Sequence, residues 1–145
     1  GNPKAIRFPR ALEGETDFSF SGLKTSVLNY VRKLDCAELD AQMADIAASF
    51  QAAVVDSLVN KTVGVVDRGD VDIQAVCLAG GVAANQPLRE ALKEQVEQRG
   101  LPFHCPSFQY CTDNAAMIGA VGVHRLSQGK VDNFELDAVP RMSLC

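Results

Sequence analysis

The amino-acid sequence predicts an α/β fold, and three observations support this. An apolar run at residues 73–79 has the length and composition of a buried strand, and Gly80 and Gly81 follow it as a tight turn. A helical pattern then continues to Arg99. A second short apolar stretch at residues 101–105 follows that helix. Strands that alternate with helices in this way are typical of α/β proteins.

Length and composition indicate one globular domain spanning residues 1–145. A chain of this length buries roughly 68–70% of its extended-chain surface, so it can fold without disulfides or metals. Lys and Arg number 14 against 18 Asp and Glu, for a net charge of -4. An acidic chain lacks the cationic surplus that displaces counterions from nucleic acid. We therefore do not expect this chain to bind a nucleic-acid backbone strongly by itself, and any nucleic-acid partner would be held mostly by groups outside this chain.

The sequence also predicts a cytoplasmic protein with no membrane segment. The longest apolar stretch, residues 115–123, is far shorter than the ~20 residues that cross a bilayer, and the first residues have no apolar signal core. An odd number of scattered cysteines without a CxxC pair favours reduced thiols over a disulfide framework. They are Cys36, Cys77, Cys105, Cys111 and Cys145.

Helical periodicity predicts two helices before the strand–turn–helix unit. Alternating Phe18 and Phe20 suggest a short strand, and Ser21 is a candidate N-cap for the first helix. A long second helix is expected over residues 38–67, because its apolar residues trace one continuous face. The first sixteen residues, without periodicity, are expected to form a loop.

Two later helices have clear start and stop signals. Asn85 is the candidate N-cap of the helix that ends before Gly100, with Pro87 in its first turn. The last helix is expected to begin through Thr112 or Asp113 and to end at Gly129. Small and apolar residues occupy most of this last helix, so we expect it to be buried on most sides.

The Gly80–Gly81 turn is the first candidate site. Two glycines after a strand permit positive φ and let backbone N–H groups approach a ligand, while the following helix N-terminus favours an anion. Asn85 could direct its amide either to the backbone, as a cap, or to a ligand. Composition alone leaves open a tight turn with an ordinary cap.

The second candidate site is Thr112-Asp113-Asn114, at the start of the last helix. These residues can cap the helix, coordinate a cation or align a ligand, and composition alone favours capping. One carboxylate does not make a metal site, and His104 and His124 lack ligand spacing. A zinc cluster of His104, Cys105 and Cys111 matches no strong pattern.

Two basic features have alternative interpretations. Lys24 could bind a phosphate, although a solvated lysine is the favoured interpretation. Lys4, Arg7 and Arg10 form a small N-terminal cluster that could contact RNA, and a solvated loop is favoured there.

Three strings together resemble a known family. They are DFSFSGLKT (17–25), LAGGVAAN (78–85) and CTDNAAMIGA (111–120). In order and spacing they are similar to the C-terminal half of the tRNA threonylcarbamoyladenosine transferases, formerly described as O-sialoglycoprotein endopeptidases or glycoproteases. The resemblance covers nearly the whole chain.

This resemblance implies a ribonuclease-H-like lobe of the actin-like, sugar-kinase ATPase superfamily. It implies a transferase that moves a threonylcarbamoyl group from threonylcarbamoyl-adenylate to N6 of the adenosine beside the tRNA anticodon, together with partner proteins. Asn85 would contact the adenylate, and Gly80 and Gly81 would permit close backbone approach. Asp113 would be a ligand of one iron or zinc ion.

The chain departs from the family because it lacks the HxxxH-like histidines and the first phosphate-binding loop of the N-terminal lobe. No catalytic residue is identifiable in it, so we expect it to be inactive alone and to expose its cleft-facing surface, with a possible homodimer as a result. One alternative is a natural short nucleotide-binding or assembly module that pairs with a separate first lobe. A metalloprotease is a further alternative, for which the sequence has no HExxH motif.

Overall fold

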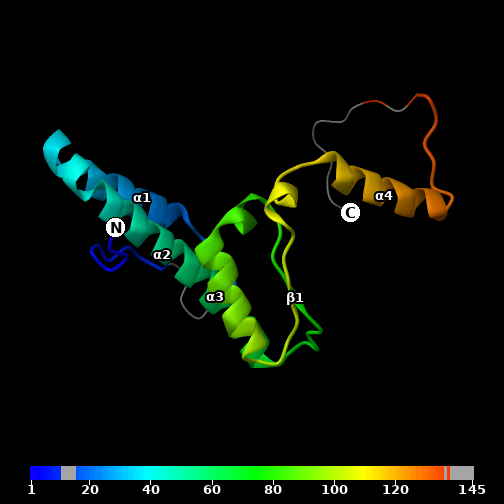
Figure 1. Cartoon of the computed structure of the whole chain (residues 1–145), viewed down its shortest axis with the longest axis horizontal. Coiled ribbons are helices and arrows are strands. Elements are labelled where there is room, and N and C mark those ends of the chain that lie inside the picture. The colour runs from blue at the N-terminus through cyan, green and yellow to red at the C-terminus, as the bar shows by residue number, and fades with distance from the viewer. Residues whose placement is uncertain (11–15, 136, 138–145) are drawn as a thin grey trace.

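The structure, a computed structural model, describes residues 1–10, 16–135 and 137 (Figure 1). Within them the fold is α/β, with mostly helices and one small parallel sheet. The elements are α1 (Ser21–Val31), α2 (Cys36–Arg68), β1 (Val76–Cys77), the 3-10 turn η1 (Gly81–Ala84), α3 (Gln86–Glu97), β2 (Phe103–His104), the 3-10 turn η2 (Phe108–Tyr110) and α4 (Ala115–Ser127).

The long helix α2 organises the fold, because α1 and α3 both pack against it. It begins with a capping box, in which the Asp35 carboxylate accepts a hydrogen bond from the Glu38 backbone N–H (2.8 Å) and the Glu38 carboxylate accepts one from the Asp35 N–H (3.0 Å). It ends at Gly69, whose φ of 66° is the left-handed conformation that favours glycine. The helix predicted over residues 38–67 is therefore confirmed, within two residues at its start.

The N-terminal segment and α1 pack on the first half of α2. Phe8 and Leu23 are 2% exposed and meet Ile46 and Ala53 of α2 in a small apolar cluster. The Phe8 ring lies edge-on to Tyr30, with centroids 6.0 Å apart. The first ten residues are thus held on the helices, although they form no helix or strand.

Two local predictions near α1 are wrong. Ser21 is the first residue of the helix and not its cap; Phe20 occupies the N-cap position without a side-chain hydrogen bond. Phe18 and Phe20 form no strand, and their exposed rings stack on each other with centroids 6.5 Å apart. Alternation over so few residues does not fix a strand when no strand of the described residues lies alongside.

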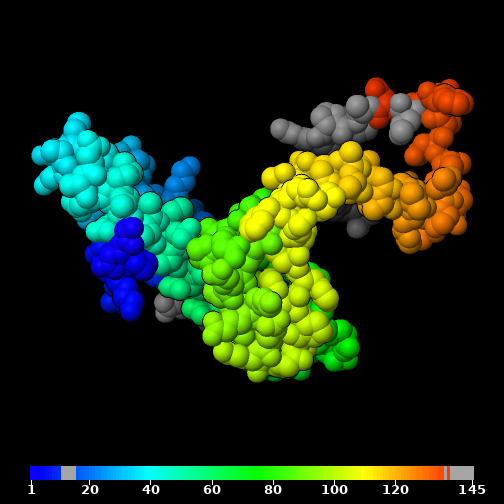
Figure 2. Space-filling model, in the orientation of Figure 1, coloured from blue at the N-terminus to red at the C-terminus, as the bar shows by residue number. Residues whose placement is uncertain are grey.

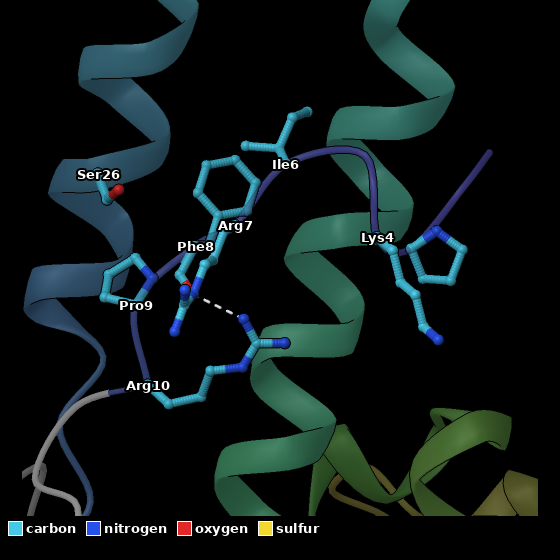
Figure 3. A pocket seen from close by; sticks show the side chains of 8 residues that line it. Lys4, Ile6, Arg7, Phe8, Pro9, Arg10 and Ser26 are labelled. Atoms are coloured by element: carbon cyan, nitrogen blue, oxygen red, sulfur yellow. Dashed lines mark hydrogen bonds between the residues drawn. The ribbon is translucent and has the colours of Figure 1, made fainter.

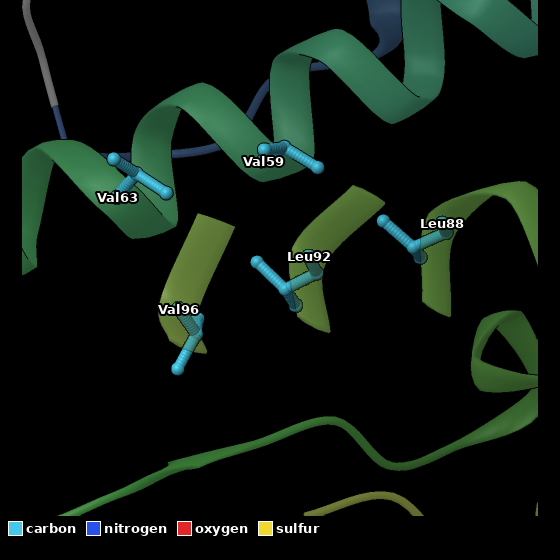
Figure 4. Close-up of a cluster of buried hydrophobic side chains, with 5 residues drawn as sticks. All are labelled: Val59, Val63, Leu88, Leu92 and Val96. Atoms are coloured by element: carbon cyan, nitrogen blue, oxygen red, sulfur yellow. The ribbon is translucent and has the colours of Figure 1, made fainter. Parts of the chain in front are cut away.

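The main apolar core lies between α2 and α3 (Figure 4). Leu88, Leu92 and Val96 recur at a spacing of four residues on α3, and each is at most 3% exposed. They face Val59 and Val63 of α2. This spacing places the three side chains on one face of α3, which explains why α3 packs along α2.

The strand–helix–strand unit is present, but its strands are shorter than predicted. Val76 pairs with Phe103, and Cys77 with His104, in a parallel ladder. The expected strands at residues 73–79 and 101–105 are thus reduced to two residues each. Parallel sheets become regular when both faces and both edges are covered, and within the described residues each strand has one neighbour.

Helix α4 contradicts the expected burial. All 13 of its residues are exposed, including Ile118 (75%) and Val123 (70%). Figure 2 shows it extending away from the body formed by α1, α2 and α3. Its apolar composition shows that it is suited to being covered, but no described element packs on it. Across the described part of the chain, no helix combines the length and apolar character needed to span a bilayer.

The described cysteines, Cys36, Cys77, Cys105 and Cys111, have free thiols. Cys145 lies outside the described residues.

An ion pair ties the end of α3 to the end of α2 and predicts a pH effect. The Arg99 guanidinium donates to both Asp67 carboxylate oxygens (2.6 and 2.9 Å), and these hydrogen bonds, then its positive charge, lower the pKa of Asp67. Because the folded-state pKa is lowered, the pair stabilises the fold above the unfolded pKa of about 3.9, and this stabilisation is lost as pH falls through the folded-state value. We expect Arg99→Gln to raise the Asp67 pKa in an NMR titration.

The same variant should lose its stability deficit relative to wild type as the pH falls below about 4. Lys93→Gln is the control, because Lys93 pairs with Glu97 and not with Asp67. An Asp67 pKa unchanged by Arg99→Gln would contradict the prediction.

Candidate functional site

The glycine turn joins β1 to α3 and is open to solvent. Gly80 has φ 86° and ψ 177°, a backbone conformation that residues other than glycine rarely adopt. Its carbonyl accepts a hydrogen bond from the Ala83 N–H (3.0 Å), which begins the 3-10 turn. Apart from the adjoining residues, no atom of the described residues lies within 4 Å of the place where a Cβ would stand on Gly80 or Gly81. The turn therefore requires glycine at Gly80 for its backbone and leaves free space above it.

Asn85 is the N-cap of α3, as the sequence predicts. Its Oδ1 accepts a hydrogen bond from the Leu88 N–H (3.0 Å), and its Nδ2 donates to Gln51 Oε1 of α2 (3.1 Å). An amide has two donors and two acceptor positions, so one of each stays available. The cap interpretation is confirmed, and it leaves Asn85 able to bind a ligand as well.

Asp113 lies just before α4 and is exposed. The N-cap of α4 is Asn114 and not Thr112 or Asp113: its Oδ1 accepts from the Met117 N–H (3.1 Å), and its Nδ2 donates to the Thr112 carbonyl (2.9 Å). Because Asn114 supplies the cap, the Asp113 carboxylate is not needed for it. It forms no hydrogen bond or ion pair with another described residue.

Metal binding by this chain alone is not supported by the arrangement of its ligating side chains. Within the described residues, no group of three or more His, Cys, Asp and Glu side chains could hold a metal ion. Cys111 is buried against Arg89, His104 is an exposed residue of β2, and His124 is exposed on α4. Asp113 could supply one ligand, and a stable site normally needs three or more from protein.

Arg89 connects the glycine turn to the loop that leads to Asp113, a role that the sequence analysis missed. From α3 its guanidinium donates to the Ala83 carbonyl in the turn, to the Pro106 carbonyl (2.7 Å) and to Cys111 Sγ (2.9 Å). It also lies over the Phe108 ring, 4.1 Å from the centroid. No hydrogen bond joins Asn85 to Asp113 among the described residues, so Arg89 provides the link between their segments.

An apolar groove beside the glycine turn brings two of the three recognised strings together. Its lining residues come from the start of α1, the middle of α2, the glycine turn with the residues before it, and the first turn of α3. They are Phe20, Ser21, Leu23, Lys24, Phe50, Val54, Leu58, Leu78, Ala79, Val82 and Leu88. Lys24 is exposed and is the cation among the described residues of this lining. The groove can therefore accept an apolar group, with a positive charge available for an anion.

These features define an α/β protein with an open, glycine-rich turn and an adjoining apolar groove. The family model described as tRNA N6-adenosine threonylcarbamoyltransferase (TsaD) matches residues 1–120. The chain belongs to this family, as its three strings predicted.

Curated relatives agree with this assignment. The chain is 42% identical over 144 residues to the tRNA N6-adenosine threonylcarbamoyltransferase of Caldicellulosiruptor saccharolyticus, covering 99% of this chain and 42% of the relative. The enzyme of the same name from Geotalea uraniireducens is 47% identical over 142 residues, which cover 97% of this chain and 41% of the relative. That of Moorella thermoacetica is 44% identical over 146 residues, at 99% and 42% coverage. The chain thus spans about 42% of the length of these relatives.

Proposed function

We propose that this chain is the C-terminal, ribonuclease-H-like lobe of a tRNA threonylcarbamoyladenosine transferase. The observation that carries the proposal is the family match over residues 1–120, at identities of 42–47% to enzymes with this name. The full protein would transfer the threonylcarbamoyl group from threonylcarbamoyl-adenylate to N6 of an adenosine in tRNA, in the cytoplasm and with partner proteins. Residues 1–145 would form one domain that supplies part of the site.

The proposed roles follow from the geometry of the glycine turn and of the segment before α4. Gly80 and Gly81 leave open space in which backbone N–H groups can approach the adenylate, and Asn85 has one donor and one acceptor position available for it. Asp113 would provide one carboxylate to an iron or zinc ion whose other ligands come from the N-terminal lobe. No catalytic step is assigned to a metal, because the described residues do not form a metal site by themselves.

Calorimetric titration tests whether the site is shared between two lobes. We expect the chain to bind ATP or a stable threonylcarbamoyl-adenylate analogue tightly only after the N-terminal half of a relative is added, with zinc or iron present. The reconstituted mixture should also modify tRNA. Tight binding by the chain alone would contradict the shared site, and absence of transfer by a folded, adenylate-binding mixture would contradict the proposed reaction.

Two substitutions at Asn85 separate its cap from its ligand role. Asn85→Ser keeps an N-cap oxygen but removes the amide, so it should retain stability and lose adenylate affinity in the reconstituted protein. Asn85→Ala should lose both, with a stability cost of about 1 kcal/mol. Gln51→Ala is the matched control, because it removes only the partner of Asn85 Nδ2. If Asn85→Ser bound the adenylate as well as wild type, the ligand role would be wrong.

The exposed apolar surface of helix α4 should favour self-association of the isolated chain. Its exposed apolar residues, such as Ile118 and Val121, form a surface that a monomer in water rarely leaves uncovered. We propose that the N-terminal lobe covers part of this surface and that the isolated chain forms a homodimer through it. Light scattering should show a concentration-dependent dimer that Ile118→Lys weakens and Val131→Lys, an equally exposed change outside α4, does not. A monodisperse monomer at high concentration would contradict the proposal.

A further inference from the structure

A basic groove runs along the N-terminal segment and α1. We define it by two adjoining cavities that share Ile6, Arg7 and Ser26. Figure 3 shows the first of them, which is lined mainly by the N-terminal segment. The remaining lining residues come from the N-terminal segment, from successive turns of α1 and from Lys33, just after the end of α1. They are Pro3, Lys4, Phe8, Pro9, Arg10, Ser21, Gly22, Thr25, Asn29, Tyr30 and Lys33.

The charge of this basic groove is opposite to that of the whole chain. Among the described lining residues, Lys4, Arg7, Arg10 and Lys33 are cations and none is Asp or Glu, whereas the chain has a net charge of -4. Lys4, Arg7 and Lys33 are exposed, and their side chains form no hydrogen bond or ion pair with another described residue. Only Arg10 is paired, with Asp56 of α2 (2.6 Å) and the Phe8 carbonyl (2.7 Å). Positive charge is thus concentrated on one face of an acidic protein.

The segment that presents these cations is a loop with exposed Lys4 and Arg7 side chains, as expected, and its backbone is anchored on α2. The Ile6 N–H donates to Ser49 Oγ (3.1 Å), and Ser49 Oγ donates to the Asn2 carbonyl (3.2 Å). Phe8 is 2% exposed, and its ring packs on Tyr30. Because the backbone is held at both ends of residues 2–8, the Lys4 and Arg7 side chains project from a fixed base and lose less entropy on binding.

The groove also offers neutral hydrogen-bond donors between its cations. Ser26 and Asn29 lie on α1 and line the groove, and their side chains form no hydrogen bond with another described residue. Arginine, lysine, serine and asparagine side chains are among the groups that proteins use to contact the phosphate oxygens of nucleic acids. A row of such groups along a groove fits a polymer with repeated negative charges better than it fits one small anion.

We propose that the basic groove binds the phosphate backbone of the tRNA substrate. This inference rests on the proposed function for the identity of the RNA. The groove holds phosphates through Lys4, Arg7 and Lys33 and does not read bases, so it positions the RNA without selecting its sequence. The acidic remainder of the chain repels the backbone elsewhere, which confines the RNA to this face.

The test is fluorescence anisotropy with a labelled, unmodified tRNA transcript and the 145-residue chain, measured over a range of salt concentrations. The variant is Arg7→Glu/Lys33→Glu, and the matched control is Arg68→Glu/Lys93→Glu. The control has the same net charge and changes exposed residues that do not line the groove. We expect the groove variant to bind about tenfold more weakly at low salt, with the slope of log K against log salt shallower by about two, one for each lost phosphate contact.

Several outcomes would overturn the groove. One is an equal loss of tRNA affinity in the two double variants, and another is tRNA binding by the wild-type chain that does not depend on salt. A third is binding of anionic vesicles or a phosphopeptide, but not of tRNA, that the groove variant loses. If the glutamate variant fails to fold by circular dichroism, Arg7→Gln/Lys33→Gln gives the same comparison with smaller charge changes. Groove-dependent tRNA binding without transfer after reconstitution would overturn the proposed reaction and leave the groove standing. If the reconstituted groove variant transfers the group and binds tRNA as well as wild type, the groove proposal is wrong and the proposed reaction stands.

Discussion

Replacing Leu92 with alanine is expected to lower the free energy of unfolding by about 3 kcal/mol. Leu92 is 3% exposed and lies in the middle of the core between α2 and α3, with Leu88 and Val96 on either side of it along the helix. These neighbours are fixed on regular helices, so they cannot move in to fill the space that the substitution leaves. Urea unfolding followed by circular dichroism should show a lower midpoint with an unchanged slope.

Leu126→Ala is the matched control for this prediction. Leu126 is 63% exposed on α4, so the same chemical change there should alter stability by no more than about 0.5 kcal/mol. Leu92→Met, which roughly keeps the volume, should cost less than about 1.5 kcal/mol. Equal costs for Leu92→Ala and Leu126→Ala would show that the core does not lie where the structure places it.

Sequence reasoning located α3 accurately because its boundaries depend on local chemistry. Asn85 caps the first turn through its own side chain, Pro87 lies within that turn, and Gly100 follows the end with φ 74°. Each of these preferences acts within a few residues. The capping box of α2 has an equally local signal, because Asp35 and Glu38 have the required spacing in the sequence.

The strands and α4 could not be predicted in the same way, because their final state depends on what lies beside them. An apolar run becomes a regular strand only where neighbouring strands complete its hydrogen bonds, and β1 pairs only with β2 among the described residues. The apolar composition of α4 indicates a helix suited to burial without saying which element covers it. The glycine turn and Asn85 were identified as a candidate site because strand, glycine and cap are consecutive in the sequence.

Arg89 could not be found from the sequence, because its partners are far from it along the chain. An arginine on an amphipathic helix is ordinarily solvated, and nothing local distinguishes Arg89 from Lys93 on the same helix. Its contacts to Pro106 and Cys111 join residues 17 and 22 positions apart. Such contacts appear only when α3 and the loop after β2 are placed together.

Substituting Arg89 should also lower the free energy of unfolding strongly. Even the conservative change to lysine should have this effect. The guanidinium donates hydrogen bonds to the Ala83 carbonyl, the Pro106 carbonyl and Cys111 Sγ at once and also lies over the Phe108 ring. A lysine ammonium is a single point without this planar fork, so it cannot reach all of these groups. We expect Arg89→Lys to lower the free energy of unfolding by about 2 kcal/mol, because polar groups of a half-buried site lose charged partners.

The same variant should show where Arg89 acts, which a general loss of stability would not. Backbone amides of Tyr110 and Cys111, which donate within the η2 turn, should exchange hydrogen faster in Arg89→Lys, while amides in the middle of α2 keep their protection relative to the global value. Arg68→Lys is the control, because Arg68 makes one hydrogen bond, to the Gly64 carbonyl of its own helix. In the reconstituted protein, loosening the segment before Asp113 should weaken adenylate binding beyond what Arg68→Lys does. If exchange near η2 is unchanged, Arg89 does not hold the two halves of the candidate site together.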